Sequence, residues 1–236
     1  MTIPKRHYSA SQLSLFLTRY DQWKDSYVDG NKPPTSREQA VGKIVHAGVQ
    51  AFHLGDEPRN GFARAFEEEK HNIPAEDTDN QLSIAGRLLE FYVKTVAPEL
   101  NIWPSGPTEA PFVEWEFCVP IPGLDVDVPL YGIIDFVDQR GGNPLIRDLK
   151  CVAKAQSLNA CKKSIQRVVY HYAFRAATGL DPVGMVFDFV TKETPTRWIP
   201  RECPPVTDDE FDKLFEDLKR MDEEVRSYGG LAAWRE

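Results

Sequence analysis

The sequence predicts an α/β protein in which a mixed central β-sheet is flanked by helices and preceded by a helical N-terminal region. Three observations predict this fold class. Apolar residues recur at helical spacing through most of about the first hundred residues. Apolar runs of strand length then follow one another between residues 113 and 152. A helical segment separates them from another apolar run at 183–190, and a crossover helix between strands implies a mixed sheet with helices packed against it.

Three capping patterns mark the predicted starts of the N-terminal helices. They are Ser9–Gln12, Ser36–Gln39 and Thr78–Gln81, each with a polar side chain at both ends of the first turn. Apolar residues at helical spacing follow each of them. A shorter helix is predicted from about Gly61 to Lys70. Residues 1–98 are therefore expected to be mainly helical.

The hydrophobic period changes after the prolines of segment 98–111, which end helical structure. Strands are then predicted at Val113–Val119, Leu130–Val137, Pro144–Val152, Val183–Val190 and Thr196–Ile199. Helices are predicted at Ser157–Thr178 and behind the capping pattern Thr207–Glu210. We expect a single domain over residues 1–236, with a sheet core at 110–200 and a C-terminal helix at 207–227.

Basic residues are concentrated in one part of an otherwise acidic chain. The net charge is −8, yet the window from Gln139 to Arg175 holds eight Lys or Arg and one acid, Asp148. Such a run is either a solvated face or a stripe that binds phosphate. In the second case Lys162, Lys163 and Arg167 of the predicted crossover helix would contact a nucleic-acid backbone without regard to its sequence.

The composition also indicates in which cellular environment the protein is expected. No uninterrupted apolar run approaches the roughly 18 residues of a membrane-spanning helix, so no membrane association is expected. The N-terminus lacks the apolar stretch of a secretory signal. The four cysteines are scattered and form no Cys-x-x-Cys pair, as expected for reduced thiols in the cytoplasm.

Two acidic residues lie in predicted neighbouring strands. Asp135 interrupts an apolar run, and Asp148 and Lys150 are two positions apart, so their side chains leave the same face of the next strand. Antiparallel pairing would bring Asp135 close to Asp148, and two adjacent carboxylates repel unless a cation lies between them. Mg²⁺ or Mn²⁺, which prefer oxygen ligands, would fill this role with Lys150 beside the ion. The alternative is an ordinary surface ion pair.

Two further positions have both a functional and a structural interpretation. His46 lies among apolar residues of a predicted helix, where a histidine is either a metal ligand or a hydrogen-bonded core residue. Gln166 and Tyr170 are four residues apart on the predicted crossover helix and therefore share one face. They either contact a substrate there or are ordinary polar residues of a helix surface.

Taken in chain order, five short motifs resemble those of the RecB-like nucleases of the PD-(D/E)XK superfamily. They are Ser9-Ala-Ser-Gln-Leu13, Gly42-x-x-x-His46, Gly132-Ile-Ile-Asp135, Asp148-Leu-Lys150 and Gln166-x-x-x-Tyr170. The resemblance covers residues 9 to 190, and the predicted order of elements matches that of the family. It implies a restriction-endonuclease-like core, in which helices flank a mixed sheet.

The resemblance also implies roles for the motif residues. The metal ligands would be the side chains of His46, Asp135 and Asp148 and the backbone carbonyl of Leu149. The catalytic residues would be Asp135, Asp148 and Lys150, with the lysine assisting the attacking water. Gln166 and Tyr170 would position the DNA strand or the catalytic groups.

The sequence departs from the family pattern in two places. Ile134 stands where many relatives have a proline before the first aspartate. Many relatives also bind an iron–sulfur cluster through one cysteine after the first helix and three near the C-terminus. Here segment 19–23 has no cysteine and only Cys203 lies in the C-terminal region, so no iron–sulfur cluster is expected.

A metal-dependent deoxyribonuclease is the function that these observations favour. By family analogy it would be an exonuclease on single-stranded or duplex DNA ends, in phage or bacterial recombination or repair. The chain has no Walker-type glycine loop, so any unwinding would come from a helicase or recombination protein as partner. Two alternatives are a catalytically inactive DNA-binding or assembly subunit with this fold, and a metalloenzyme acting on a small phosphoester. The sequence leaves the oligomeric state and the cleavage polarity open.

Overall fold

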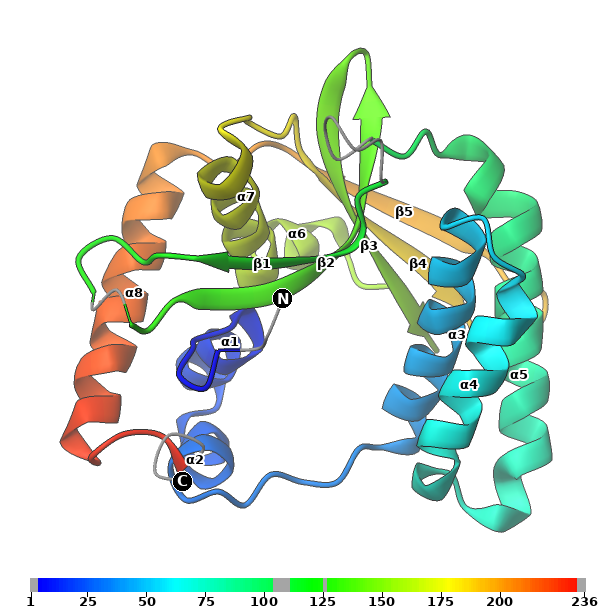
Figure 1. Ribbon diagram of the computed structural model, residues 1–236, viewed down its shortest axis with the longest axis horizontal. Coiled ribbons are helices and arrows are strands. Elements are labelled where there is room, and N and C mark those ends of the chain that lie inside the picture. Colours follow the sequence, from blue (N-terminus) through cyan, green and yellow to red (C-terminus); the bar gives the residue numbers. More distant parts are fainter. Residues whose placement is uncertain (1–3, 104–110, 125–126, 233–236) are drawn as a thin grey trace.

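A five-stranded β-sheet lies between two groups of helices in the computed structural model, which describes residues 4–103, 111–124 and 127–232 (Figure 1). The strands, in their order across the sheet, are β1 (Val113–Val119), β2 (Leu130–Arg140), β3 (Asn143–Val152), β4 (Met185–Thr191) and β5 (Trp198–Cys203). Neighbouring strands are antiparallel except β3 and β4, which run parallel. The predicted mixed sheet is confirmed.

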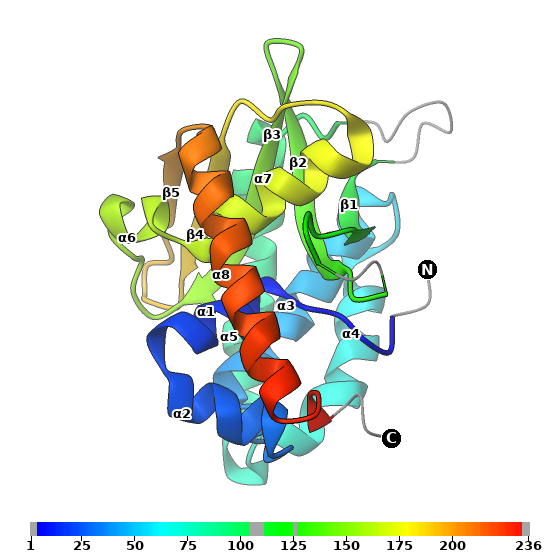
Figure 2. The same ribbon diagram turned by 90° about the vertical axis from the view of Figure 1, so that its left-hand side faces the viewer.

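The larger helices fall into two groups on either side of the sheet (Figure 1). One group consists of α1 (Ala10–Thr18), α2 (Tyr20–Trp23), α7 (Ile165–Thr178) and α8 (Asp208–Ser227), and Figure 2 shows α8 crossing in front of α7. The other consists of α3 (Arg37–His53), α4 (Pro58–Glu69) and α5 (Thr78–Phe91). Single π-helical turns, Lys24–Val28 and Tyr92–Val96, follow α2 and α5, and short 3₁₀ turns lie at 70–72, 75–77 and 97–99. Within the described ranges no helix combines the length and apolarity needed to cross a membrane.

Each group of helices buries an apolar face against the sheet, which gives two hydrophobic clusters. The first contains Leu13, Phe117, Phe174, Phe187 and Leu218, and the second contains Val41, Leu88, Tyr92, Phe136 and Leu149. Strand β2 contributes to both, because Ile134 belongs to the first cluster and Phe136 to the second. Asp135, between these two residues, is therefore held at the junction of the two halves of the molecule.

Two of the three predicted N-terminal caps and the C-terminal one are observed. Ser36 and Gln39 form a reciprocal capping box at the start of α3, and Thr207 forms another with Glu210 at the start of α8. The Ser9 side chain accepts a hydrogen bond from the backbone of α1. These bonds satisfy amide groups that a helix leaves without partners.

The predicted capping box at Thr78 is wrong. Helix α5 begins at Thr78, but its N-cap is Asp77, whose side chain makes no bond to the helix backbone. The Asp77 carboxylate instead accepts hydrogen bonds from the side chains of Arg37, Asn80 and Gln81. Side chains from α5 itself and from α3, the second of which the local sequence does not reveal, thus occupy the carboxylate that would otherwise cap the helix.

The predicted crossover helix Ser157–Thr178 consists of two helices. Lys163 and Ser164 separate α6 (Leu158–Lys162) from α7, and Ser164 has extended backbone as the N-cap of α7. Gly179 ends α7 in the left-handed conformation, as predicted, with φ 73°. Because of the break, residues on either side of it do not share the faces of one continuous helix.

Candidate active site

Strands β2 and β3 place Asp135 and Asp148 next to each other. The last pair of the β2–β3 ladder is Phe136 with Arg147, and Asp135 and Asp148 are the next residues of the two strands beyond it. Both side chains are buried, and Asp135 Oδ2 accepts a hydrogen bond of 2.7 Å from the backbone nitrogen of Leu149. The structure therefore brings together the two carboxylates that the sequence singles out.

Helix α3 adds His46 to this pair of aspartates. The capping box at Ser36 starts the helix, and its apolar face packs over β3, which directs His46 toward the sheet. His46 Nε2 lies 3.0 Å from the carbonyl oxygen of Leu149, and Nδ1 lies 3.7 Å from Asp135 Oδ2. The imidazole and the Leu149 carbonyl thus face one another, and both face the aspartates.

Glu114 on β1 is a further acidic residue of the site that sequence reasoning missed. Its Oε1 lies 3.6 Å from His46 Nδ1, is buried, and has no hydrogen-bond partner in the described residues. Its φ of 46° is the sole positive value of a residue other than glycine in the described ranges, and such strain is found most often at functional sites. Trp115 pairs with Ile134, so Glu114 is opposite Asp135, a register that strand prediction alone does not give.

Asp148 is held by a lysine and a glutamine. Lys150 Nζ forms an ion pair of 2.8 Å with Asp148 Oδ2. Gln166 on α7 donates hydrogen bonds to Asp148 Oδ1, at 2.6 Å, and to the hydroxyl oxygen of Tyr170, at 2.8 Å. Gln166 and Tyr170 therefore share one face of α7, and that face is turned toward the active site.

We call His46, Glu114, Asp135 and Asp148 the carboxylate cluster. Burial raises the pKa of Asp148 to about 6, with a smaller opposing effect from Lys150. Burial also raises the pKa of Asp135. Burial alone would lower the pKa of His46, but Asp135 and Glu114 outweigh it and raise that pKa to about 9. Burial is thus the largest cause of the shifts at the two aspartates, whereas at His46 the neighbouring carboxylates outweigh burial.

The donor atoms of the carboxylate cluster fit a divalent metal ion. His46, Glu114 and Asp135 each offer one ligand atom, and these atoms lie within 4.8 Å of one another. Carboxylate oxygens and an imidazole suit ions from Mg²⁺ and Mn²⁺ to the later transition metals. Glu114 Oε1 is buried and accepts no hydrogen bond from the part of the chain that the structure describes, so it is the kind of atom that such an ion would satisfy.

Two hollows meet at Lys150. One has a volume of about 580 Å³ and is lined by α3, including Gln39, Lys43 and His46, and by the end of β3. The other has a volume of about 380 Å³ and is lined by the first turns of α1 and α7 and by β2. Because Lys150 lines both, the candidate metal centre has open space on two sides where a polymeric substrate could run.

The basic residues between Gln139 and Arg175 do not form one stripe. Arg167 is only 2% exposed, donates to the carbonyls of Lys162 and Pro204, and pairs with Glu210. It is therefore unavailable to a substrate, which corrects its predicted role as a contact to the nucleic-acid backbone. Lys162 and Lys163 are exposed, but they line a hollow between α7 and α8 and neither of the two hollows at Lys150.

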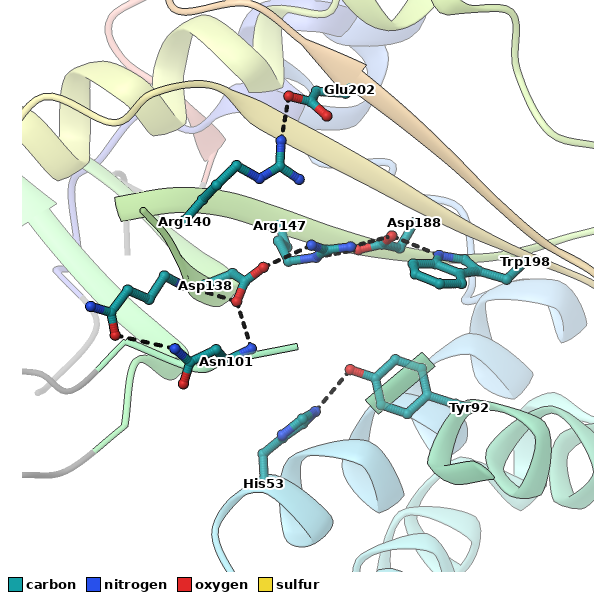
Figure 3. Close-up of polar contacts among 10 residues, drawn as sticks. His53, Tyr92, Asn101, Asp138, Arg140, Arg147, Asp188, Trp198 and Glu202 are labelled. Carbon is teal, nitrogen blue, oxygen red and sulfur yellow. Dashed lines mark hydrogen bonds and ion pairs between the residues drawn. The ribbon is translucent and has the colours of Figure 1, made fainter. Parts of the chain in front are cut away.

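A second buried polar group, which we call the arginine network, is built around Arg147 of β3 (Figure 3). Arg147 and Asp148 are neighbours in this strand, so their side chains leave opposite faces of it. Arg147 donates to both oxygens of Asp188, at 2.8 and 2.9 Å, and to Asp138 Oδ2 at 2.9 Å. Trp198 also donates to Asp188, at 2.8 Å, and the backbone nitrogen of Asn101 donates to Asp138, at 2.7 Å. This group joins β2, β3, β4 and β5, and every carboxylate oxygen of Asp138 and Asp188 accepts a hydrogen bond.

Comparison with known proteins gives the family and the fold. A family model described as the PD-(D/E)XK nuclease superfamily matches residues 7–235. The crystal structure of a protein from Eubacterium rectale named "Putative exonuclease" is similar with a TM-score of 0.63 and 15% identity, over 95% of this chain and 82% of that chain. The crystal structure of SSO0001 covers 77% of this chain and 74% of that chain at 11% identity, but its TM-score of 0.33 is too low to indicate a shared fold. No curated protein matches the sequence.

Proposed function

The chain belongs to the PD-(D/E)XK nuclease superfamily, and we propose that it is a metal-dependent deoxyribonuclease of the RecB-like type. The single observation that carries the proposal is the carboxylate cluster beside Lys150, a residue that lines two hollows. A divalent metal ion would be held by His46, Glu114 and Asp135, with Asp148 and the carbonyl of Leu149 in the same group. When bound, the ion supplies Lewis acidity to the scissile phosphate and lowers the pKa of water.

The residues around the carboxylate cluster have separate tasks in this proposal. Lys150 carries a positive charge at the junction of the two hollows, where it can orient the attacking water and stabilise charge on the phosphoryl oxygens. Gln166 fixes the orientation of the Asp148 carboxylate through its bond to Oδ1. Attack in line with the scissile bond would expel the 3′ oxygen.

Several finer features belong to the proposal. We propose Mg²⁺ or Mn²⁺ as the ion, no iron–sulfur cluster, and exonucleolytic cleavage at DNA ends, which the name of the Eubacterium rectale protein supports. Exposed Lys162 and Lys163 would attract the backbone of the DNA beyond the active site. A single domain, a cytoplasmic location, a role in recombination or repair and a helicase or recombination protein as partner complete the proposal.

Cleavage assays with three DNA forms test this function. The purified chain is incubated with linear single strands, linear duplex and closed circles, each with Mg²⁺, with Mn²⁺ or with a chelator. We expect metal-dependent loss of linear DNA and intact circles. Cleavage of circles would show an endonuclease, and binding without cleavage under every condition would show an inactive DNA-binding subunit.

A further inference from the structure

The smaller hollow beside Lys150 is lined by several uncharged side chains that carry hydroxyl or amide groups. We call it the hydroxyl hollow and define it by Ser9, Ser11, Ser14, Ser164, Gln166 and Tyr170. The four serines come from α1 and from the N-cap of α7, and the Ser9-Ala-Ser-Gln-Leu13 motif has no role in the proposed chemistry. None of the described residues that line this hollow is an aspartate or a glutamate, whereas Lys150 borders it.

The hydroxyl hollow retains hydrogen-bond donors that the protein does not use. Ser164 makes no side-chain cap bond, although it is the N-cap of α7. Ser9 Oγ and Ser11 Oγ lie 3.0 Å apart and share one proton, which leaves a second proton for a ligand. Tyr170 is 8% exposed, and its hydroxyl oxygen accepts from Gln166, so its own proton can be donated into the hollow.

The electrostatic field in the hydroxyl hollow favours the binding of an anion. The first turns of α1 and α7 both line it, the two helices contact each other, and neither has an acidic residue in its first turn. The N-terminal end of a helix carries a partial positive charge, and the Lys150 ammonium adds a full one. The closest acid of the carboxylate cluster, Asp148, is held by Lys150 and Gln166.

We propose that the hydroxyl hollow binds the phosphodiester next to the scissile one, in an unpaired nucleic-acid strand. This inference rests on the proposed function, because it takes the carboxylate cluster as the place of cleavage. The strand would lie between the first turns of α1 and α7 and against Tyr131 and Phe117, which also line the hollow. The hollow has a volume of about 380 Å³ and is lined by the first turns of two helices that contact each other, which leaves room for one strand, so the substrate class that we propose is single-stranded.

The first test removes two hydroxyls whose loss does not disturb the fold. Ser11 is exposed and Ser164 makes no cap bond, so we combine Ser11→Ala with Ser164→Ala. Affinity for a single-stranded hexanucleotide is measured by fluorescence anisotropy with Ca²⁺ in place of Mg²⁺, and a gel checks that the strand stays intact. We expect affinity to fall about tenfold or more, because hydrogen bonds to a charged phosphate are lost. Ser83→Ala, at an exposed position of α5, is the matched control and should bind as the wild type does.

The second test identifies the contacted phosphate. Hexanucleotides with one neutral methylphosphonate, placed in turn on either side of the cleaved bond, are bound to the wild type and to the double variant. At one of the neighbouring positions the methylphosphonate should weaken binding to the wild type about tenfold. It should weaken binding to the double variant much less, because the serine substitutions and the methylphosphonate remove the same contact. Annealing the strand to its complement should weaken binding by a similar factor, with no further effect of the serine changes.

The outcomes separate this inference from the proposed function. If the double variant binds the hexanucleotide within twofold of the wild type, or if serine and methylphosphonate effects are additive at every position, the inference is overturned while nuclease activity stands. Equal losses on duplex and on single strands would overturn the assignment to an unpaired strand. Absence of metal-dependent cleavage by the wild type would instead contradict the proposed function.

Discussion

The carboxylate cluster and the arginine network are two buried acidic groups that use neighbouring residues of the same strand. Asp148 belongs to the first and Arg147 to the second, and their side chains leave opposite faces of β3. In the arginine network both oxygens of Asp188 and both oxygens of Asp138 accept hydrogen bonds. In the carboxylate cluster Glu114 Oε1 has no such partner in the described residues.

The difference shows how a structural polar group can be told from a functional one. A buried carboxylate that is fully hydrogen-bonded holds strands together, and nothing need be added to it. In the carboxylate cluster a buried oxygen of Glu114 accepts no hydrogen bond from the described residues, so a cation can be added to this group as a ligand. The predictions that follow use this contrast, because changes in the two groups should affect stability and activity in opposite ways.

The largest effect is expected from Asp148 and its lysine partner. Asp148→Asn removes a charged oxygen ligand and should abolish cleavage together with tight metal binding, a loss on the order of 10³-fold or more in rate. Lys150→Ala leaves the metal ligands in place, so it should still bind the ion and lose about 10²-fold in the chemical step. Calorimetric metal titration and single-turnover cleavage measure both. Wild-type cleavage by Lys150→Ala would contradict the role of the lysine.

The next effect concerns stability and the arginine network. Asp188→Asn leaves the buried Arg147 guanidinium with a weaker partner on that side and should lower the free energy of unfolding by about 3–5 kcal/mol. Urea unfolding in chelator measures this change, and cleavage well below the melting temperature should stay close to that of the wild type. Asp135→Asn is the matched control: it removes a charge whose burial raises the pKa of this carboxyl, so it should leave stability unchanged or higher while abolishing cleavage. If both variants lose stability equally, the contrast between the two groups is wrong.

Glu114 should give an intermediate effect. Glu114→Gln keeps the shape of the side chain but removes the charge, so metal affinity should fall about tenfold and more ion should be needed for full cleavage. Glu114→Gly removes the ligand too, and it relieves the positive φ of 46°, so it should unfold at a higher urea concentration than Glu114→Gln. Unchanged metal affinity in both variants would show that Glu114 is not a ligand.

The sequence predicted the fold well because local signals determine it. The capping patterns at Ser36 and Thr207 fix the starts of helices, and the glycine turn after Arg140 fixes the antiparallel pairing of β2 with β3. That pairing alone brings Asp135 beside Asp148. Local sequence therefore carries the part of the candidate site that lies on a single hairpin.

The residues that sequence reasoning misplaced depend on contacts between distant segments. Glu114 faces the cluster because of the register of β1 on β2, and the ten residues between the two strands do not determine that register. Arg167 is buried because Glu210 and the carbonyl of Pro204, from beyond β5, pair with it. A run of basic residues in the sequence does not show which of their charges are already paired with acidic residues in the folded protein.

The smallest predicted effect comes from a buried histidine outside both groups. His171 is 2% exposed, its Nε2 has no hydrogen-bond partner in the described residues, and the charged groups near it are Arg167, Glu210 and Asp181. Burial lowers the pKa of His171 from 6.5 to about 4, whereas the two carboxylates facing His46 raise the pKa of that imidazole to about 9. The pKa of a buried histidine thus shifts down where burial dominates, as at His171, and up where neighbouring carboxylates outweigh burial, as at His46.

Stability should therefore fall in acid through His171. Between pH 6.5 and about 4 the unfolded chain binds a proton at this residue that the folded chain does not, so the contribution is fully present above pH 6.5 and is lost as the pH falls through this window. We expect a loss on the order of 1 kcal/mol by pH 5 from this group. His171→Gln, which cannot titrate, should show a shallower decline in urea midpoint between pH 7 and 5 than the wild type. Parallel pH profiles for the two proteins would mean that His171 is not held neutral by the fold, and the contrast with His46 would then fail.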